Sequence, residues 1–266
     1  MTKEELTKYA DFAEGLAHQA GNIMLSYFRS STKTTTWKPD NSPVTQADLE
    51  INTLVINEVK RSYPDHGVLG EEEAFAIERR ILWVVDPIDG TAPYDLGMPN
   101  STFCLALVVD GMVMVSVVHD PFSKRLFSAT RGAGAYVNGK KITCNKNGSL
   151  AQRYAFVPTG SKEEPHLFES FIKDLKKRGS KTLFIPSFTY LATLVLEGSA
   201  SGALMSYGSP WDAAAISLIA EEAGATASDL LGNRRSYSEW GDGILITNSA
   251  SHQYYVDGIA HARARH

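Results

Sequence analysis

The stretch LWVVDPIDGT at residues 82–91 places two carboxylates where an apolar run stops. The run ILWVV is typical of a buried strand, so the side chain of Asp86 is predicted to emerge at the buried end of that strand. An unpaired charge there costs several kcal/mol, and it normally loses its ionisation or finds a cation. No lysine or arginine lies between residues 81 and 121 to serve as that cation. Asp89 returns toward Asp86 after a turn expected at Pro87, and the two carboxylates repel unless a divalent ion lies between them.

Other acidic residues could complete an ion site. Glu71, Glu72 and Glu73 follow a leucine-glycine pair, Asp212 follows a proline-tryptophan pair, and Asp48 opens a predicted helix. Each has an ordinary interpretation: a solvated acidic turn for the glutamates, and a helix cap or a favourable helix dipole for the two aspartates. These groups are oxygen donors only, and the seven histidines show no paired metal spacing. Mg²⁺ or Mn²⁺ is therefore favoured over zinc or copper.

Gly90 and Thr91 add a second kind of group to the same stretch. Their backbone amides can bind an anion, and a glycine permits a ligand to approach closely. An anion held beside a divalent ion is the arrangement of a phosphate site. Carboxylates that hold two or more ions suit in-line attack of water on phosphorus, so hydrolysis of a phosphomonoester is the predicted class of reaction.

The pattern of apolar residues divides the chain near residue 150. Helices are predicted from the N-terminus to about residue 28 and from Thr45 to about Arg61, with a loop rich in Ser, Thr and Pro between them. Period-two runs predict an antiparallel meander over 81–85, 103–109, 112–118 and 125–129. Beyond residue 150, short strands alternate with helices at 163–178, 188–197 and 211–223. Two subdomains are expected, 1–150 with most metal ligands and 151–266 with Asp212 and substrate contacts.

Composition and charge limit the kinds of molecule that this protein is expected to bind. The net charge of −4 and the sequence pI of about 6.0 give no positive field for a nucleic-acid backbone. The N-terminus is too polar for a signal peptide, and the longest apolar tract, 103–118, is broken by Asp110-Gly111 and cannot span a membrane. Two cysteines without a CxxC pair are typical of free thiols in a reducing compartment. We expect a cytoplasmic protein that binds a small phosphorylated metabolite, not nucleic acid or a membrane.

The motifs together resemble those of the inositol monophosphatase family. The resemblance rests on KPDNSPVTQAD at 38–48, LGEE at 69–72, WVVDPIDGT at 83–91, RGAGAYVNGKKI at 131–142 and SPWDAAAISLIAEEAGA at 209–225. It implies an α/β (α+β) fold of the layered α/β/α/β/α sandwich type, usually as a homodimer. It also implies a magnesium-dependent, often lithium-sensitive phosphatase with two or three Mg²⁺ ions and Mn²⁺ as an alternative.

Carried over by position, the resemblance assigns metal ligands. Glu71, Asp86 and the Ile88 carbonyl would bind one ion, and Asp86, Asp89 and Asp212 would bind a second. Glu71 would also help to hold a third ion or the attacking water.

The resemblance also implies catalytic and substrate-binding residues. Thr91 matches the threonine that activates water, and Asp48 matches the carboxylate that orients it. The amides of Gly90 and Thr91 would bind the phosphate, and Lys38 lies near the entrance. The full set implied on the substrate side is Lys38, Asp89, Gly90, Thr91, Ser187, Met205 and Asp212.

Departures from the family pattern leave the substrate open. Met205 stands where inositol-specific members have a glutamate that binds ring hydroxyls, and a thioether is a poor acceptor for them. APYDLG at 92–97 replaces the usual continuation after DGT, and Asp95 within it is either a solvated loop acid or a group that recognises a cationic substrate. Phe188 and Thr189 follow Ser187 where small residues are usual.

Several functions therefore stay open. The leading expectation is hydrolysis of an inositol monophosphate-like or related alcohol or sugar phosphate. KPDNSPVTQAD and PDHGVLGEEE look closer to the histidinol-phosphate phosphatases and the nucleotide 3′-phosphatases of the same fold. A metal-binding regulatory protein with little turnover is the alternative of another class. The terminal HARARH is expected to be a disordered tail.

Overall fold

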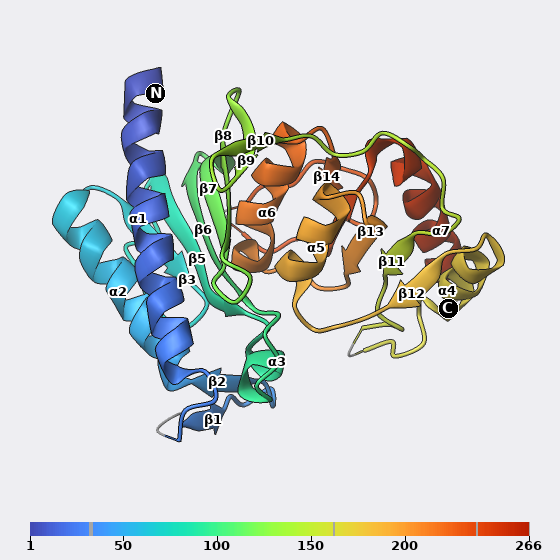
Figure 1. Cartoon of the computed structure of the whole chain (residues 1–266), viewed down its shortest axis with the longest axis horizontal. Coiled ribbons are helices and arrows are strands. Elements are labelled where there is room, and N and C mark those ends of the chain that lie inside the picture. Colours follow the sequence, from blue (N-terminus) through green and yellow to red (C-terminus); the bar gives the residue numbers. More distant parts are fainter. Residues whose placement is uncertain (32–33, 162, 238, 266) are drawn as a thin grey trace.

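Two β-sheets alternate with three layers of helices (Figure 1). The computed structural model describes residues 1–31, 34–161, 163–237 and 239–265. One outer layer holds α1 (Lys3–Tyr27) and α2 (Gln46–Ser62), the middle layer α5 (Phe188–Leu196) and α6 (Pro210–Glu222), and the other outer layer α4 (Glu169–Lys177) and α7 (His252–Arg263). This arrangement is the α/β/α/β/α sandwich that the family resemblance predicts.

The first sheet has eight strands in the order β10-β9-β8-β7-β6-β5-β3-β4. They are β3 (Gly67–Gly70), β4 (Ala74–Phe75), β5 (Ile81–Asp89), β6 (Thr102–Val109), β7 (Met112–Asp120), β8 (Arg125–Thr130), β9 (Gly134–Val137) and β10 (Lys140–Ile142). Strands β5 to β8 form the predicted antiparallel meander, and β9 and β10, which were not predicted, extend it. The predicted turn between β6 and β7 is present, with positive φ angles of 50° at Asp110 and 75° at Gly111. Strand β3, which was not predicted, runs parallel to β5 and places Gly70 opposite Val85.

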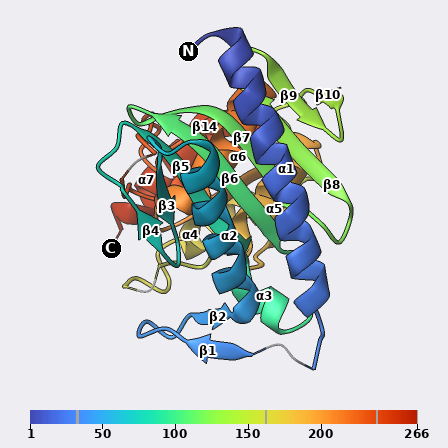
Figure 2. The same ribbon diagram turned by 90° about the vertical axis from the view of Figure 1, so that its left-hand side faces the viewer.

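Helices α1 and α2 cover one face of this sheet, as Figure 2 shows from that side. Helix α1 begins at a capping box, in which Glu5 N donates to Thr2 Oγ1 and Thr2 N donates to Glu5 Oε2, at 3.2 and 2.6 Å. Between α1 and α2, strands β1 (Thr35–Trp37) and β2 (Pro43–Thr45) form a hairpin where only a loop was predicted. The hairpin lies next to the short helix α3 (Thr91–Asp95), which follows β5.

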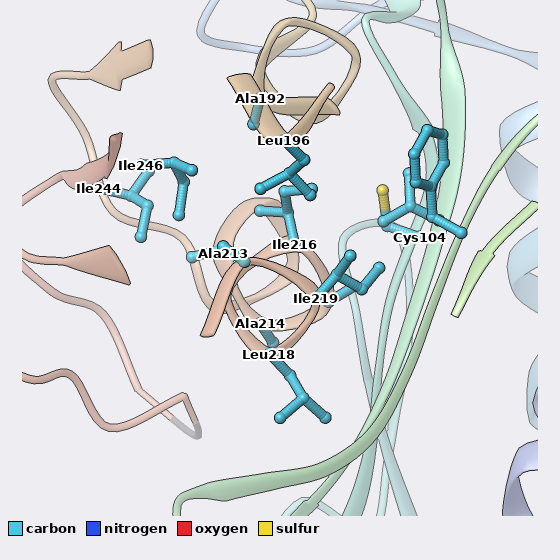
Figure 3. Packing of buried hydrophobic residues seen from close by; sticks show 14 of the residues in the cluster. Cys104, Ala192, Leu196, Ala213, Ala214, Ile216, Leu218, Ile219, Ile244 and Ile246 are labelled. Carbon is cyan, nitrogen blue, oxygen red and sulfur yellow. The ribbon is translucent and has the colours of Figure 1, made fainter. Parts of the chain in front are cut away.

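The second sheet has five strands in the order β12-β11-β13-β15-β14. They are β11 (Tyr154–Phe156), β12 (Lys181–Leu183), β13 (Ala200–Met205), β14 (Thr226–Ser228) and β15 (Ile244–Thr247). Helices α5 and α6 fill the space between the sheets with buried aliphatic side chains, among them Leu196, Ile216 and Ile219 (Figure 3). Because α6 packs against strands of both sheets, Asp212 in its first turn is fixed between them.

Two elements of the second half differ from the prediction. The helix expected at 163–178 begins only at Glu169, because residues 163–168 form bends and turns around Pro165, which disfavours the helical conformation at the residue before it. The prediction that HARARH is a disordered tail is wrong for its first three residues, which complete α7. Arg263 among them donates to both carboxylate oxygens of Asp242, at 2.7 and 2.8 Å, and His266 lies outside the described residues.

Three further features concern the chain as a whole. Cys104 and Cys144 are both free, as predicted, and both are buried. In the part of the chain that the structure describes, no helix combines the length and the apolar character that crossing a bilayer requires. The division into subdomains near residue 150 stays a prediction, because α6 belongs to the second half but packs against both sheets.

Candidate metal centre

A β-bulge brings Asp86 and Asp89 together at the end of β5. In a regular strand, residues three apart point to opposite faces of the sheet. Here Asp86 pairs with Cys104 and Asp89 pairs with Thr102, so β5 carries one more residue than β6 over this interval. Proline has no N–H for the ladder and suits such a position. The prediction of a turn at Pro87 is therefore wrong. The chain forms a bulge there, within a strand that continues to Asp89.

Asp212 joins these two carboxylates from the first turn of α6. Oxygen atoms of Asp86, Asp89 and Asp212 lie within 4.8 Å of one another. Burial, together with the charge of Glu71, raises the pKa of Asp86 and of Asp212 well above the ordinary value, and burial also raises the pKa of Asp89. Without a cation, protonation of at least one of these three carboxylates is therefore favoured.

The two aspartates of β5 differ in what surrounds their oxygens. Asp89 lies at the N-terminus of α5, where its Oδ2 accepts hydrogen bonds from Ser187 Oγ at 2.7 Å and from N and Oγ1 of Thr189 at 3.0 and 2.6 Å. Its Oδ1 accepts from Phe188 N at 3.1 Å. Among the described residues, no donor reaches the buried Oδ1 of Asp86. A buried carboxylate oxygen without a donor is costly, so this atom marks the place for a cation.

Asp48 links α2 to Thr91. Its Oδ2 accepts hydrogen bonds from N and Oγ1 of Thr45, at 2.8 and 2.5 Å, which is the capping interaction predicted for it. Its Oδ1 accepts from Thr91 Oγ1 at 3.3 Å, and the same hydroxyl lies 3.1 Å from the carbonyl oxygen of Ile88. Burial raises the pKa of Asp48 to about 7. The capping role and a role at the site are compatible, because each uses a different oxygen.

Lys38 reaches the site from the turn between β1 and β2. Its Nζ lies 2.8 Å from Glu71 Oε1 and 2.6 Å from Glu72 Oε1. Glu71 follows β3, whose register with β5 sets it beside Asp86. Burial raises the pKa of Glu72, and the ammonium of Lys38 opposes that shift. Of the three glutamates, only Glu73 is exposed, so the interpretation as a solvated acidic turn holds for Glu73 alone.

The residues predicted to contact substrate are only partly gathered here. Gly90 has a φ of 85°, and a Cβ on it would lie 2.7 Å from Ser187 Cβ, so this position requires glycine. Met205 is 5% exposed, and its side chain packs in the hydrophobic cluster around α5 and α6. Asp95 accepts a hydrogen bond from Thr35 Oγ1 at 2.5 Å. That bond ties α3 to β1, a structural role that neither predicted interpretation of Asp95 included.

Three residues at this place were not predicted to belong to the site, and of these the sequence marks only Thr189, as a departure from the family pattern. Thr189 donates two hydrogen bonds to Asp89, Tyr207 lies two residues beyond β13, and Arg235 donates from a buried position to the carbonyl oxygen of Gly208 at 2.8 Å. No local motif marks Tyr207 or Arg235. The sequence could have indicated a site role for Tyr207, because this residue follows a predicted buried strand and shortly precedes Asp212.

This set of groups fits a hard divalent cation. The clustered ligands are carboxylates, and oxygen ligands are those that Mg²⁺ and Ca²⁺ prefer. A cation there would neutralise buried charge and give Asp86 Oδ1 the partner it lacks among the described residues. Asp86, Asp89 and Asp212 would hold it, with Glu71 and the Ile88 carbonyl beside them.

Comparisons with known proteins find relatives that match most of the chain. A family model described as the inositol monophosphatase family matches residues 5–265. Nus factor SuhB of Vibrio cholerae is 32% identical over 229 residues, which cover 81% of this chain and 83% of that protein. Histidinol-phosphatase of Chlorobaculum parvum is 30% identical over 257 residues, which cover 96% of this chain and 97% of that protein. The solved structure of an IMPase/NADP phosphatase complexed with Mg²⁺ and phosphate has a TM-score of 0.83 and 25% identity, and the match covers 96% of this chain and 95% of that chain.

Proposed function

This chain belongs to the inositol monophosphatase family, and from that premise we propose that it is a phosphatase that hydrolyses a small phosphomonoester with Mg²⁺ as cofactor. The observation that carries the proposal is the buried cluster of three carboxylates within 4.8 Å, with Asp86 Oδ1 lacking a donor among the described residues. A solved relative that holds Mg²⁺ and phosphate supports the choice of ion. Two or three ions are expected, with Mn²⁺ as an alternative.

The residues of the site have separate parts in the proposed reaction. Mg²⁺, when bound, stabilises negative charge that develops on the phosphoryl oxygens. Thr91 Oγ1, held between Asp48 and the Ile88 carbonyl, is placed to orient a water molecule. With a pKa of about 7, Asp48 can take a proton by way of that hydroxyl near neutral pH. The water oxygen bonds to phosphorus, the ester P–O bond breaks, the alcohol departs with a proton, and inorganic phosphate remains.

Asp89→Asn tests the proposal. The substitution removes one charge from the ion-binding cluster, so Mg²⁺-dependent release of phosphate from glycerol 2-phosphate is expected to fall below detection. Asp110→Asn is the matched control, because it also removes a carboxylate but from the exposed β6–β7 turn, and its turnover is expected to stay at the native level. Circular dichroism of both variants shows whether the fold is kept. Undiminished turnover by Asp89→Asn would contradict the proposal.

The proposal also concerns the alcohol part of the substrate, which determines which phosphate ester the protein prefers. Because Met205 is buried and its thioether is a poor acceptor, we propose that inositol 1-phosphate is a weaker substrate than histidinol phosphate or a nucleoside 3′-phosphate. Values of kcat/KM for the three esters test it, and a clear preference for inositol 1-phosphate would overturn it.

A regulatory protein with little turnover is the second candidate. The name Nus factor, carried by a relative 32% identical to this chain, favours it. Purified protein with Mg²⁺ that released no phosphate from any of these esters would support this candidate. A kcat/KM of about 10⁴ M⁻¹s⁻¹ or more on any one of them, which is ordinary for an enzyme, would exclude it.

We also propose a homodimer, formed through the β12 edge of the second sheet. Tyr154, Leu183 and Phe184 on or beside this edge are 40%, 48% and 52% exposed. Apolar side chains on an exposed edge strand favour pairing with another chain. Light scattering is expected to give twice the mass of the 29.1 kDa chain, and a single-chain mass at micromolar concentration would contradict the proposal.

A further inference from the structure

Two large aromatic side chains are exposed beside the candidate metal centre. Tyr207 is 60% exposed and Trp240 is 66% exposed, in a chain whose other aromatic residues are mostly buried or half-buried. Tyr207 follows β13, and Trp240 lies in the connection between β14 and β15. The ring of Trp240 meets the ring of Trp211 edge-to-face, with centroids 5.4 Å apart and an interplanar angle of 79°. Trp211 directly precedes Asp212, so Trp240 stands beside the turn of α6 that carries that ligand.

Backbone contacts hold the two exposed residues close together. Gly241, next to Trp240, donates its N–H to the carbonyl oxygen of Gly208, next to Tyr207, at 2.9 Å. A Cβ on Gly208 would lie 2.2 Å from the Gly241 carbonyl oxygen, so the two backbones are in direct contact. Tyr207 and Trp240 are thus neighbours in space although they are far apart in the sequence.

A buried arginine fixes this contact. Arg235 is 8% exposed, and its guanidinium donates to the carbonyl oxygens of Gly208 and Gly243, both at 2.8 Å. It therefore joins the segment after β13 to the segment before β15. Arg263 of α7 holds the same segment from the other side through Asp242. An exposed ring on such a braced segment loses little conformational freedom when a ligand covers it.

Tyr207 lies in the connection between β13 and α6, the helix whose first turn carries Asp212. Desolvation of the Tyr207 hydroxyl, and the charges of Asp212 and Asp89, raise the pKa of Tyr207 above its ordinary value. Its hydroxyl is desolvated, but Tyr207 as a whole residue is 60% exposed. A phosphoryl group at the carboxylate cluster would therefore leave the rest of its ester next to an aromatic surface.

We propose that Tyr207 and Trp240 form a subsite for a planar aromatic or heteroaromatic ring carried by the alcohol part of the substrate. The inference rests on the proposed phosphatase function and specifies its substrate class. Aromatic faces stack favourably on planar rings, whereas they offer poor acceptors to the hydroxyls of a polyol. The products are the free ring-bearing alcohol and inorganic phosphate, because water replaces the ester oxygen on phosphorus.

Matched esters and matched variants test the subsite. The esters are 2-phenylethyl phosphate, 2-cyclohexylethyl phosphate, which is similar in size but not planar, and glycerol 2-phosphate. The native enzyme is expected to prefer the phenyl ester in kcat/KM. Tyr207→Ala and Trp240→Ala are each expected to lower the phenyl-to-glycerol ratio about tenfold, the loss of one stacking contact, while Tyr207→Phe keeps it. Leu231→Ala, which removes another exposed side chain of the same segment, is the control and leaves the ratio unchanged.

A binding measurement separates failure of the subsite from failure of the phosphatase function. Calorimetry with Mg²⁺ compares 2-phenylethylphosphonate, which cannot be hydrolysed, with propylphosphonate. Tighter binding of the phenyl compound that disappears in Trp240→Ala supports the subsite even if no ester is turned over, a result that would overturn only the phosphatase function. Equal binding of both phosphonates, or a ratio of kcat/KM that neither alanine variant changes, would overturn the subsite.

Discussion

The two sides of the candidate site are assembled in different ways. On one side, Asp86, Asp89, Gly90 and Thr91 follow one another at the end of a single strand, and one bulge sets the two carboxylates together. On the other side, Tyr207 and Trp240 come from segments far apart in the sequence, which are joined by a bond between glycine backbones, by one buried arginine and by the pairing of β13 with β15. Groups for the reaction therefore depend on local chain geometry, while the surface beside them depends on tertiary contacts. Substitutions on the two sides should differ in kind as well as in size.

The largest effect is expected on the strand side, from Asp86→Asn. Loss of this ligand should lower kcat at least about 10³-fold, since electrostatic stabilisation by a bound metal is worth several kcal/mol. Phosphate release in saturating Mg²⁺ measures the change. Full activity would show that Asp86 is not a ligand and that the cluster is structural.

The same substitution should stabilise the metal-free protein. The pKa of Asp86 in the folded chain lies well above the value of about 3.9 for the unfolded chain. The folded state therefore keeps a proton that the unfolded state has lost, and the free energy of unfolding decreases as the pH rises from about 4 through the folded-state pKa. Asparagine does not titrate, so the advantage of Asp86→Asn should grow with pH and reach about 2 kcal/mol at pH 8.

Thermal unfolding in EDTA between pH 5 and 8 tests this sign. The native protein should gain stability from added Mg²⁺, most at the higher pH, and the variant should gain much less. An Asp86→Asn protein that is less stable than the native one without metal would show that the carboxylate has a partner that neutralises it.

Gly208→Ala should produce the next largest effect, on the other side of the site. The new Cβ would meet the backbone of Gly241 and push apart the two segments that carry Tyr207 and Trp240. A clash with backbone costs about 1–3 kcal/mol of stability. The phenyl-to-glycerol ratio of kcat/KM should also fall, because the two rings separate.

Gly15→Ala is the control for this substitution. Gly15 lies in α1, and a Cβ added to it would have no neighbouring atom within 4 Å, so alanine should stabilise the helix by about 0.5–1 kcal/mol. A Gly208→Ala protein as stable and as selective as the native one would show that the contact between the segments is not needed.

The same contrast explains which parts of the molecule could be predicted from the sequence. The meander, both N-terminal helices and the gathering of Asp86, Asp89 and Asp212 follow from apolar periodicity and from motifs read by family resemblance. Strand β3 could not be predicted, because a four-residue strand that owes its place to parallel pairing with β5 has too little pattern of its own. Helix α7 has a short apolar stripe of Tyr255, Ile259 and Ala262 among polar residues and was missed, and with it the bond from Arg263 that braces the Trp240 segment.

The roles of single residues could likewise be predicted only where their partners are close in the sequence. Asp48 had two competing interpretations because its two oxygens have different partners, Thr45 at the start of its own helix and Thr91 at the start of the distant helix α3. Only the first of these partners is encoded locally. Arg235 and Tyr207 carry no local pattern at all, since their positions follow from how β13, β15 and the segment between β14 and β15 pack.

The smallest effect is expected from Lys38→Met, which tests a long-range contact on the strand side. The ammonium of Lys38 neutralises part of the charge on Glu71 and Glu72. Its removal leaves more negative charge beside the cluster, so Mg²⁺ should bind about fivefold more tightly, which corresponds to about 1 kcal/mol for a partly exposed ion pair. Calorimetric titration at pH 8 measures the change, with Lys140→Met on the distant strand β10 as the control. Weaker binding of Mg²⁺ would instead mean that Lys38 holds Glu71 in the position that the ion needs, and the strand side would then depend on tertiary contacts as much as the aromatic side does.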